Sequence, residues 1–166
     1  MRLAFVLLMS LAGSACAAVP PPAQPSLLPP PLVRPPAPEV YSRVTANRDT
    51  ARILTGLSNR GLVATPDDVS QAEFLAPAPG YVWRVGSDWL HIHVYADQTQ
   101  ASLAAQRFVA QAMSRSQIID WVGAPRLFQC GSAVALFLGD NPQALTVLTY
   151  MCGPPKYDPA RTATAG

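Results

Sequence analysis

The chain has 166 residues, a formal net charge of +2 and 13% charged side chains, a size that suits one domain with appendages. Its basic residues are almost all arginines, with Lys156 the single lysine, and they are scattered from Arg34 to Arg161 without forming a block. This dispersed charge excludes the basic patch typical of nucleic-acid-binding proteins, so we expect no nucleic-acid partner.

The start of the chain has the pattern of an export signal. Arg2 precedes an apolar run from Leu3 to Leu11, and small residues follow up to Ala18. The run is too short to span a bilayer, which requires about 20 apolar residues. Residues 1–17 are therefore predicted to be a cleaved signal segment. We expect an extracytoplasmic protein, either a cell-envelope lipoprotein or a periplasmic or secreted form.

Two cleavage reactions fit the same residues. Gly13-Ser14-Ala15-Cys16 resembles a bacterial lipobox, in which Cys16 becomes the lipid-bearing first residue, although leucine is usual where Gly13 stands. Ala15-Cys16-Ala17 instead fits the small-x-small pattern for release after Ala17. We favour lipidation of Cys16, with the released form as the alternative.

Proline sets the next boundary. Ten of the 18 prolines lie between Pro20 and Pro38, and proline fixes φ and donates no backbone hydrogen bond. Residues 18–42 are therefore predicted to be an extended tether. The last residues, 154–166, lack periodic apolar positions and are predicted to be a disordered tail. A single domain over residues 43–153 remains between them.

The first half of this domain begins with a helix and a hairpin. Apolar spacing predicts a helix over residues 45–60 that ends at Gly61, and then a short strand over residues 62–64. Two β-rich runs, residues 81–85 and 89–95, flank a glycine-containing turn and predict a hairpin. If Gly86-Ser87 is a two-residue turn, all the apolar side chains of both strands fall on one face. That face carries Tyr81, Trp83, Val85, Leu90, Ile92 and Val94.

The second half of the domain is also predicted to contain helices and strands. A helix is expected from Asp97, its N-cap, to Met113, with an inward face that includes Leu103. A strand over residues 118–122 and a hairpin of residues 126–130 and 133–138 follow, the last run being apolar on both faces as in an interior strand. A final helix begins at Asp140 or Asn141 and ends at Gly153. The fold class is α+β, with a mostly antiparallel sheet of about four to six strands and two or three helices packed on one face.

The order of these motifs resembles a group of small, uncharacterised bacterial secreted proteins and lipoproteins with a signal segment and one compact α+β domain. The resemblance spans about residues 54–153 and rests on motifs that mark turns and the ends of strands. Its motifs are Pro79-Gly80 before the first hairpin, Tyr95-Ala96-Asp97 after it, and Trp121-x-x-x-Pro125-x-x-Phe128-x-x-Gly131-x-x-Val134-x-Leu136-x-Leu138-Gly139-Asp140-Asn141. The group often has histidine where Arg126 stands, and Cys130 and Cys152 are not typical of it. The resemblance implies the fold and an extracytoplasmic location but no activity.

His91 and His93 are the chain's two histidines and project from one strand face. Two such imidazoles could ligate zinc or copper, but no third ligand follows from the spacing, so we predict no metal and no cofactor. A half-solvated strand face is the simpler interpretation. Catalytic motifs are also missing from the sequence, which has no G-x-S-x-G elbow, P-loop or dinucleotide fingerprint.

Cys130 and Cys152 remain in the mature chain whichever way the signal is cut. An even pair in an oxidising compartment predicts a disulfide between the last hairpin and the last helix, with two buried free thiols as the alternative.

We therefore expect an envelope-associated, non-enzymatic binding or structural module. The second face of the first hairpin is the candidate contact surface, since aromatic and arginine side chains are enriched at binding hot spots, with a covering layer of loop or helix as the alternative. Its residues are Arg84, Trp89, His91, His93 and Tyr95. The expected partner is an envelope protein or another ligand, with membrane contact only through a lipid anchor. The alternative function is a small secreted hydrolase or metal-dependent enzyme that uses His91 and His93.

Overall fold

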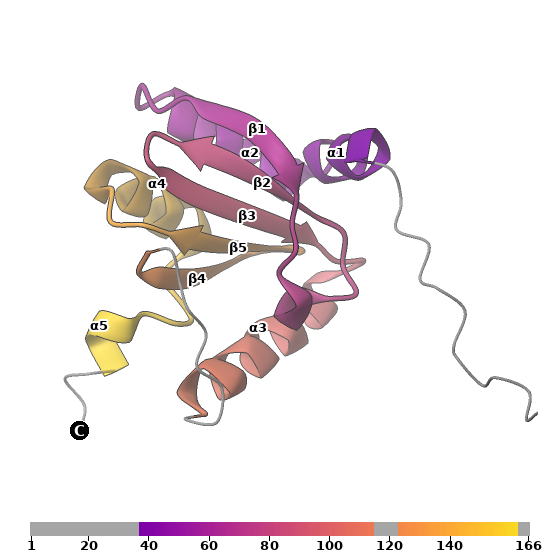
Figure 1. Cartoon of the computed structure of the whole chain (residues 1–166), viewed down its shortest axis with the longest axis vertical. Coiled ribbons are helices and arrows are strands. Elements are labelled where there is room, and N and C mark those ends of the chain that lie inside the picture. Colours follow the sequence, from indigo (N-terminus) through magenta and orange to yellow (C-terminus); the bar gives the residue numbers. More distant parts are fainter. Residues whose placement is uncertain (1–36, 115–122, 163–166) are drawn as a thin grey trace, which may run out of the picture. The chain divides into compact units, whose positions relative to one another are not determined.

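A computed structural model describes residues 37–114 and 123–162. The strand predicted over residues 118–122 and the signal segment with Cys16 lie outside the described residues. The described part forms an α+β domain around one open antiparallel sheet, as the sequence predicts (Figure 1). None of its helices is long and apolar enough to cross a membrane.

The sheet has five strands in the order β1-β2-β3-β5-β4, and every neighbouring pair is antiparallel. The strands are β1 (Ala64–Val69), β2 (Gly80–Val85), β3 (Asp88–Val94), β4 (Pro125–Cys130) and β5 (Ala133–Leu138). All six residues of β5 are buried between β3 and β4, which confirms the predicted interior strand. The predicted strand over residues 62–64 lies later in the chain, as β1.

The register of the first hairpin follows from its turn. Val85 pairs with Asp88 and Trp83 pairs with Leu90, so Gly86-Ser87 is the two-residue turn that the hydrophobic pattern predicts. Gly86 has a φ of 66°, a conformation that glycine adopts without the steric cost of a Cβ. The predicted apolar face of the hairpin belongs to the main core, where it packs with the helices of residues 37–45, 48–58 and 142–152.

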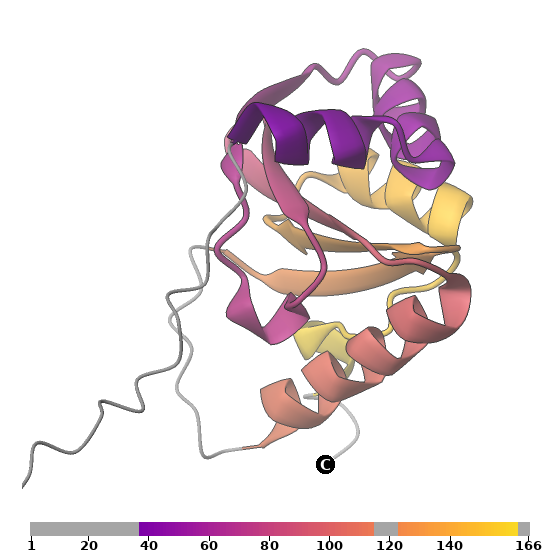
Figure 2. The same cartoon turned by 90° about the vertical axis from the view of Figure 1, so that its right-hand side faces the viewer.

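Helices cover both faces of the sheet (Figure 2). The helices α1 (Ala37–Thr45), α2 (Arg48–Ser58) and α4 (Pro142–Cys152) pack on the face that carries Trp83 and Ile92. The helix α3 (Gln98–Met113) and the short 3-10 helix η1 (Glu73–Leu75) pack on the other face, over Leu127 and Leu136. The prediction of helices on one face is correct for three of them, whereas α3 lies on the opposite side.

Side-chain caps explain where several helices begin. Asn47 and Asn141 accept backbone N–H bonds at the starts of α2 and α4, and Asp97 caps α3. Asn47 is extended, with ψ at 131°, so α1 ends before it and the helix predicted over residues 45–60 is found as α2, which begins at Arg48. The predicted tether over residues 18–42 therefore overlaps α1, which begins at Ala37.

The end of the domain contains a covalent link and a further turn of structure. A disulfide joins Cys130 at the end of β4 to Cys152 at the end of α4, with Cα atoms 4.4 Å apart, which confirms the predicted pair. Residues 154–162 differ from the predicted disordered tail. The Tyr157 carbonyl accepts a 3.0 Å hydrogen bond from the Leu127 N–H, and α5 (Pro159–Thr162) follows.

Candidate functional site

The five predicted contact residues do lie on the second face of the first hairpin. Arg84 is exposed, and its guanidinium carbon lies 4.2 Å from the centroid of the half-buried Trp89 ring. His91 is half-buried, whereas His93 is 2% exposed and Tyr95 is 7% exposed. The expectation of a continuous contact surface is therefore wrong for His93 and Tyr95, which are buried.

The segment of residues 70–79 buries these two side chains, together with α3. It follows β1, includes η1 and packs its Phe74 ring edge-on against Phe108 of α3 at 5.2 Å. Leu75 is fully buried in the same cluster. The sequence does not predict that residues 70–79 cover this face of the hairpin, because they have neither helical nor strand periodicity.

Ser70 joins the two histidines. Its Oγ lies 2.9 Å from Nδ1 of His91 and 2.8 Å from Nε2 of His93, and it accepts a 3.3 Å bond from the Ala72 N–H. The other ring nitrogen of His93, Nδ1, lies 3.1 Å from the Ala78 carbonyl oxygen. A carbonyl can only accept, so Nδ1 of His93 carries a proton.

This contact assigns the remaining protons. Burial lowers the pKa of both His91 and His93 to about 4, so both rings are neutral at pH 7. Neutral His93 then has an unprotonated Nε2, which accepts the hydroxyl proton of Ser70. Ser70 has only one proton to give, and His91 therefore donates its Nδ1–H to Ser70. Every polar atom that these contacts join has a partner.

Tyr95, which follows His93 on the same face of the hairpin, also contacts the segment of residues 70–79. Its hydroxyl donates a 2.7 Å bond to the Leu75 carbonyl, and burial raises its pKa to about 12. His93 and Tyr95 thus fasten residues 70–79 to the end of β3. They are positioning residues for this segment and do not themselves form an exposed surface.

A groove opens between the fastened segment and α3. It has a volume of about 750 Å³ and is lined mainly by apolar atoms. One wall is Pro77, Ala78 and Pro79, and the end of β3 forms the floor. The opposite wall is formed by side chains of α3, including Leu103 and Arg107. Its size is within the range of about 300–1,000 Å³ that is typical of small-molecule sites.

Leu103 was expected to face the sheet, and the structure corrects this. The residues of α3 that pack inward are Ala101, Ala104, Ala105 and Phe108. Leu103 lies on a neighbouring face, 54% exposed at the groove. Small alanines let the helix approach the sheet closely, and the larger leucine is left outside. Helical spacing alone does not separate such an exposed leucine from a core residue.

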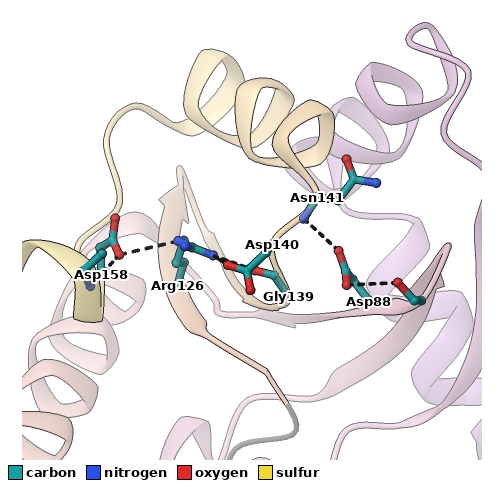
Figure 3. Close-up of polar contacts among 8 residues, drawn as sticks. Asp88, Arg126, Gly139, Asp140, Asn141 and Asp158 are labelled. Carbon is teal, nitrogen blue, oxygen red and sulfur yellow. Dashed lines mark hydrogen bonds and ion pairs between the residues drawn. The ribbon is translucent and has the colours of Figure 1, made fainter.

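A second, polar depression lies at the opposite end of β3, between the turn of the first hairpin and the start of α4. Its volume is about 610 Å³, and it includes Asp88, Trp89 and Asp140. Asp88 accepts a 3.0 Å bond from the Asn141 N–H (Figure 3). The backbone N–H groups at the start of α4, which have no acceptor within the helix, therefore already donate to Asp88 and to the Asn141 side chain.

Arg126 completes the polar contacts near this depression. Its guanidinium donates to the Gly139 carbonyl at 2.6 Å and pairs with Asp140 at 3.0 Å and Asp158 at 3.5 Å (Figure 3). The charge of Arg126 is thus neutralised by two carboxylates. We interpret this cluster as a structural link between β4, the start of α4 and α5.

Within residues 37–114 and 123–162, the His, Cys, Asp and Glu side chains do not gather in groups of three that could hold a metal ion. Both histidines share the Ser70 hydroxyl as a hydrogen-bond partner. Comparisons with protein-family models, with curated proteins and with solved structures found no match to this chain.

Proposed function

We propose that this chain is an extracytoplasmic, non-enzymatic binding module whose ligand occupies the groove between α3 and residues 77–79. The observation that carries the proposal is that the apolar groove has a wall fixed in place by buried side chains. His93 donates to Ala78 within that wall, and the Val94 N–H donates to Pro79. A preorganised apolar groove binds a ligand without the entropic cost of ordering its own wall.

The extracytoplasmic location of the chain is part of the proposal. The Cys130–Cys152 disulfide fits an oxidising compartment, and the first 17 residues have the pattern of an export signal. We propose further that Cys16 is lipidated and that the chain is a cell-envelope lipoprotein, as in the group that its strand and turn motifs resemble. A lipid on Cys16 would then be its contact with the membrane.

An uncharged fluorescent probe tests the groove. N-phenyl-1-naphthylamine should bind the purified mature protein saturably, at one site, with an increase in emission. Leu103→Glu should abolish this binding, because it places a carboxylate on the exposed apolar wall. Tyr150→Glu is the matched control, since Tyr150 is 82% exposed on α4 and lies outside the groove. Equal binding by both variants, or no saturable binding, would overturn the proposal.

The second candidate function is a small hydrolase, and one observation favours it. The Ser70 hydroxyl faces Nε2 of His93 at 2.8 Å while a carbonyl orients Nδ1, which is the arrangement of a nucleophile, a base and an orienting group. Against it, Ser70 Oγ already accepts two N–H bonds and His93 is almost fully buried. A fluorophosphonate probe separates the two, since a hydrolase would be labelled at Ser70 and the binding module would not.

A further inference from the structure

The charge in the groove points to a class of ligand. Among the described residues that line it, Arg107 is the one charged residue and none is acidic. The guanidinium also lies close enough to Tyr95 to act on its hydroxyl electrostatically. The groove is therefore apolar over most of its length, with a single positive charge at the α3 side.

Arg107 differs from Arg84 and Arg126 in what it contacts. Arg126 is neutralised by Asp140 and Asp158, and Arg84 stacks on Trp89. Arg107 makes no ion pair with a carboxylate of residues 37–114 and 123–162. A guanidinium presents paired N–H donors that match a carboxylate. The fork of Arg107 is thus available to a ligand.

From this complementarity we infer that the groove binds a single-chain amphiphile with a carboxylate head group, such as a medium-chain fatty acid. The inference rests on the proposed function and specifies its ligand. The carboxylate would pair with Arg107, and the alkyl chain would lie along Pro77 and the exposed side chain of Leu103. Gln100 and Gln106 also line the groove, and their side-chain amides can donate hydrogen bonds.

Two other occupants fit the structure less well. An extended peptide that adds to a sheet needs a free strand edge, but β3 is paired on both sides by β2 and β5. A bilayer surface attracts clusters of basic residues, whereas Arg107 is the single basic residue in the part of the groove lining that the structure describes. A single alkyl chain with one negative charge satisfies both the apolar walls and the isolated cation.

Displacement of N-phenyl-1-naphthylamine from the mature protein tests the inference, with decanoate and decanol as competitors of equal chain length. Decanoate should bind more tightly than decanol. Arg107→Gln should weaken decanoate binding by about tenfold or more and leave decanol binding unchanged. Arg84→Gln is the control, because Arg84 lies outside the groove, and it should change neither affinity.

The outcomes separate this inference from the proposed function. If decanol binds as tightly as decanoate, or if Arg107→Gln weakens both equally, the carboxylate is not recognised and the inference is wrong, while the groove remains a binding site. Binding of the protein to phosphatidylglycerol vesicles without displacement of the probe by decanoate would also overturn the inference. If the probe itself does not bind, the proposed function fails first.

Discussion

The imidazole of His93 fills the space that a side chain at Gly80 would occupy. The two residues are direct partners across β2 and β3, and a Cβ built on Gly80 would overlap the ring atoms of His93. Gly80 is itself buried. The glycine therefore lets the ring lie flat against β2, with Nδ1 directed at Ala78 and Nε2 at Ser70. The part of the fastening of residues 70–79 that His93 provides therefore depends on the absence of a side chain at Gly80.

Gly80→Ala is expected to destabilise the domain by about 1–3 kcal/mol, because the methyl group displaces His93 from its hydrogen bonds. Chemical denaturation followed by tryptophan fluorescence measures this change. In a His93→Ala background the same substitution should cost much less, since the overlapping ring is gone. Additive effects of the two substitutions would contradict the contact.

Ser70→Ala should cost about 1–3 kcal/mol of unfolding free energy, since it leaves Nε2 of His93 without a donor and Nδ1 of His91 without an acceptor. The matched control is Ser87→Ala in the exposed hairpin turn, which should change stability by less than about 0.5 kcal/mol. Equal losses in the two variants would mean that the Ser70 hydroxyl does not link the histidines.

Stability should fall as the pH is lowered from about 6.5 to about 4. Both histidines have folded-state pKa values of about 4, below the value of 6.5 expected in the unfolded chain. In this window the unfolded state binds more protons than the folded state, so acid favours unfolding. The shift in the pKa of the buried His93 alone would lower the free energy of unfolding by about 3 kcal/mol across this window.

Urea denaturation at several pH values, with a double variant His91→Gln/His93→Gln as the control, measures this effect. The double variant should lose most of the slope between pH 4 and pH 6.5, even if it is less stable at pH 7. A slope that persists unchanged would assign the acid sensitivity to other groups.

The elements that local chemistry specifies could be predicted closely from the sequence. The two-residue turn at Gly86-Ser87 fixes the register of β2 and β3, because a shift by one residue would exchange the two faces. Asp97 and Asn141 are strong N-caps, and α3 and α4 begin directly after them. Two cysteines in the folded region were sufficient to predict the disulfide.

What the sequence did not predict depends on tertiary contacts. Residues 70–79 pair little with the sheet and cover it through separate contacts of Ser70, Phe74 and Leu75, which leave no repeating pattern. The histidines were therefore placed at a surface that this segment buries. The groove was missed for the related reason that Leu103 fits the helical spacing of core residues but lies beside the inward face.

Replacing both cysteines by alanine should lower the unfolding free energy by about 3 kcal/mol, because the disulfide closes a loop of 22 residues in the unfolded chain. Alanine is preferred to serine, since Cys130 is buried and a hydroxyl there would lack a partner. Denaturation curves with and without a reductant measure the effect. The reductant should destabilise the parent protein and leave the double variant unchanged. Alkylation of both thiols under denaturing, non-reducing conditions would refute the bond.

The mature protein should begin at Cys16 or directly after Ala17. The reason is the order of Arg2, a short apolar run and small residues, which is typical of segments that signal peptidases remove. Intact mass spectrometry of protein purified from its own cells decides between the forms. A diacylglyceryl group on Cys16 would establish the lipoprotein, and an unmodified chain beginning at Ala18 would establish release.

Cys16→Ala is the informative variant for this step. In a lipoprotein it removes the only side chain that can carry the lipid, so the protein should move from the membrane fraction to the soluble fraction. In a released protein the same change preserves the small residues at the cleavage site, and the distribution should not change. A mature chain that still begins at Met1 would contradict both forms and, with them, the proposed address outside the cytoplasm.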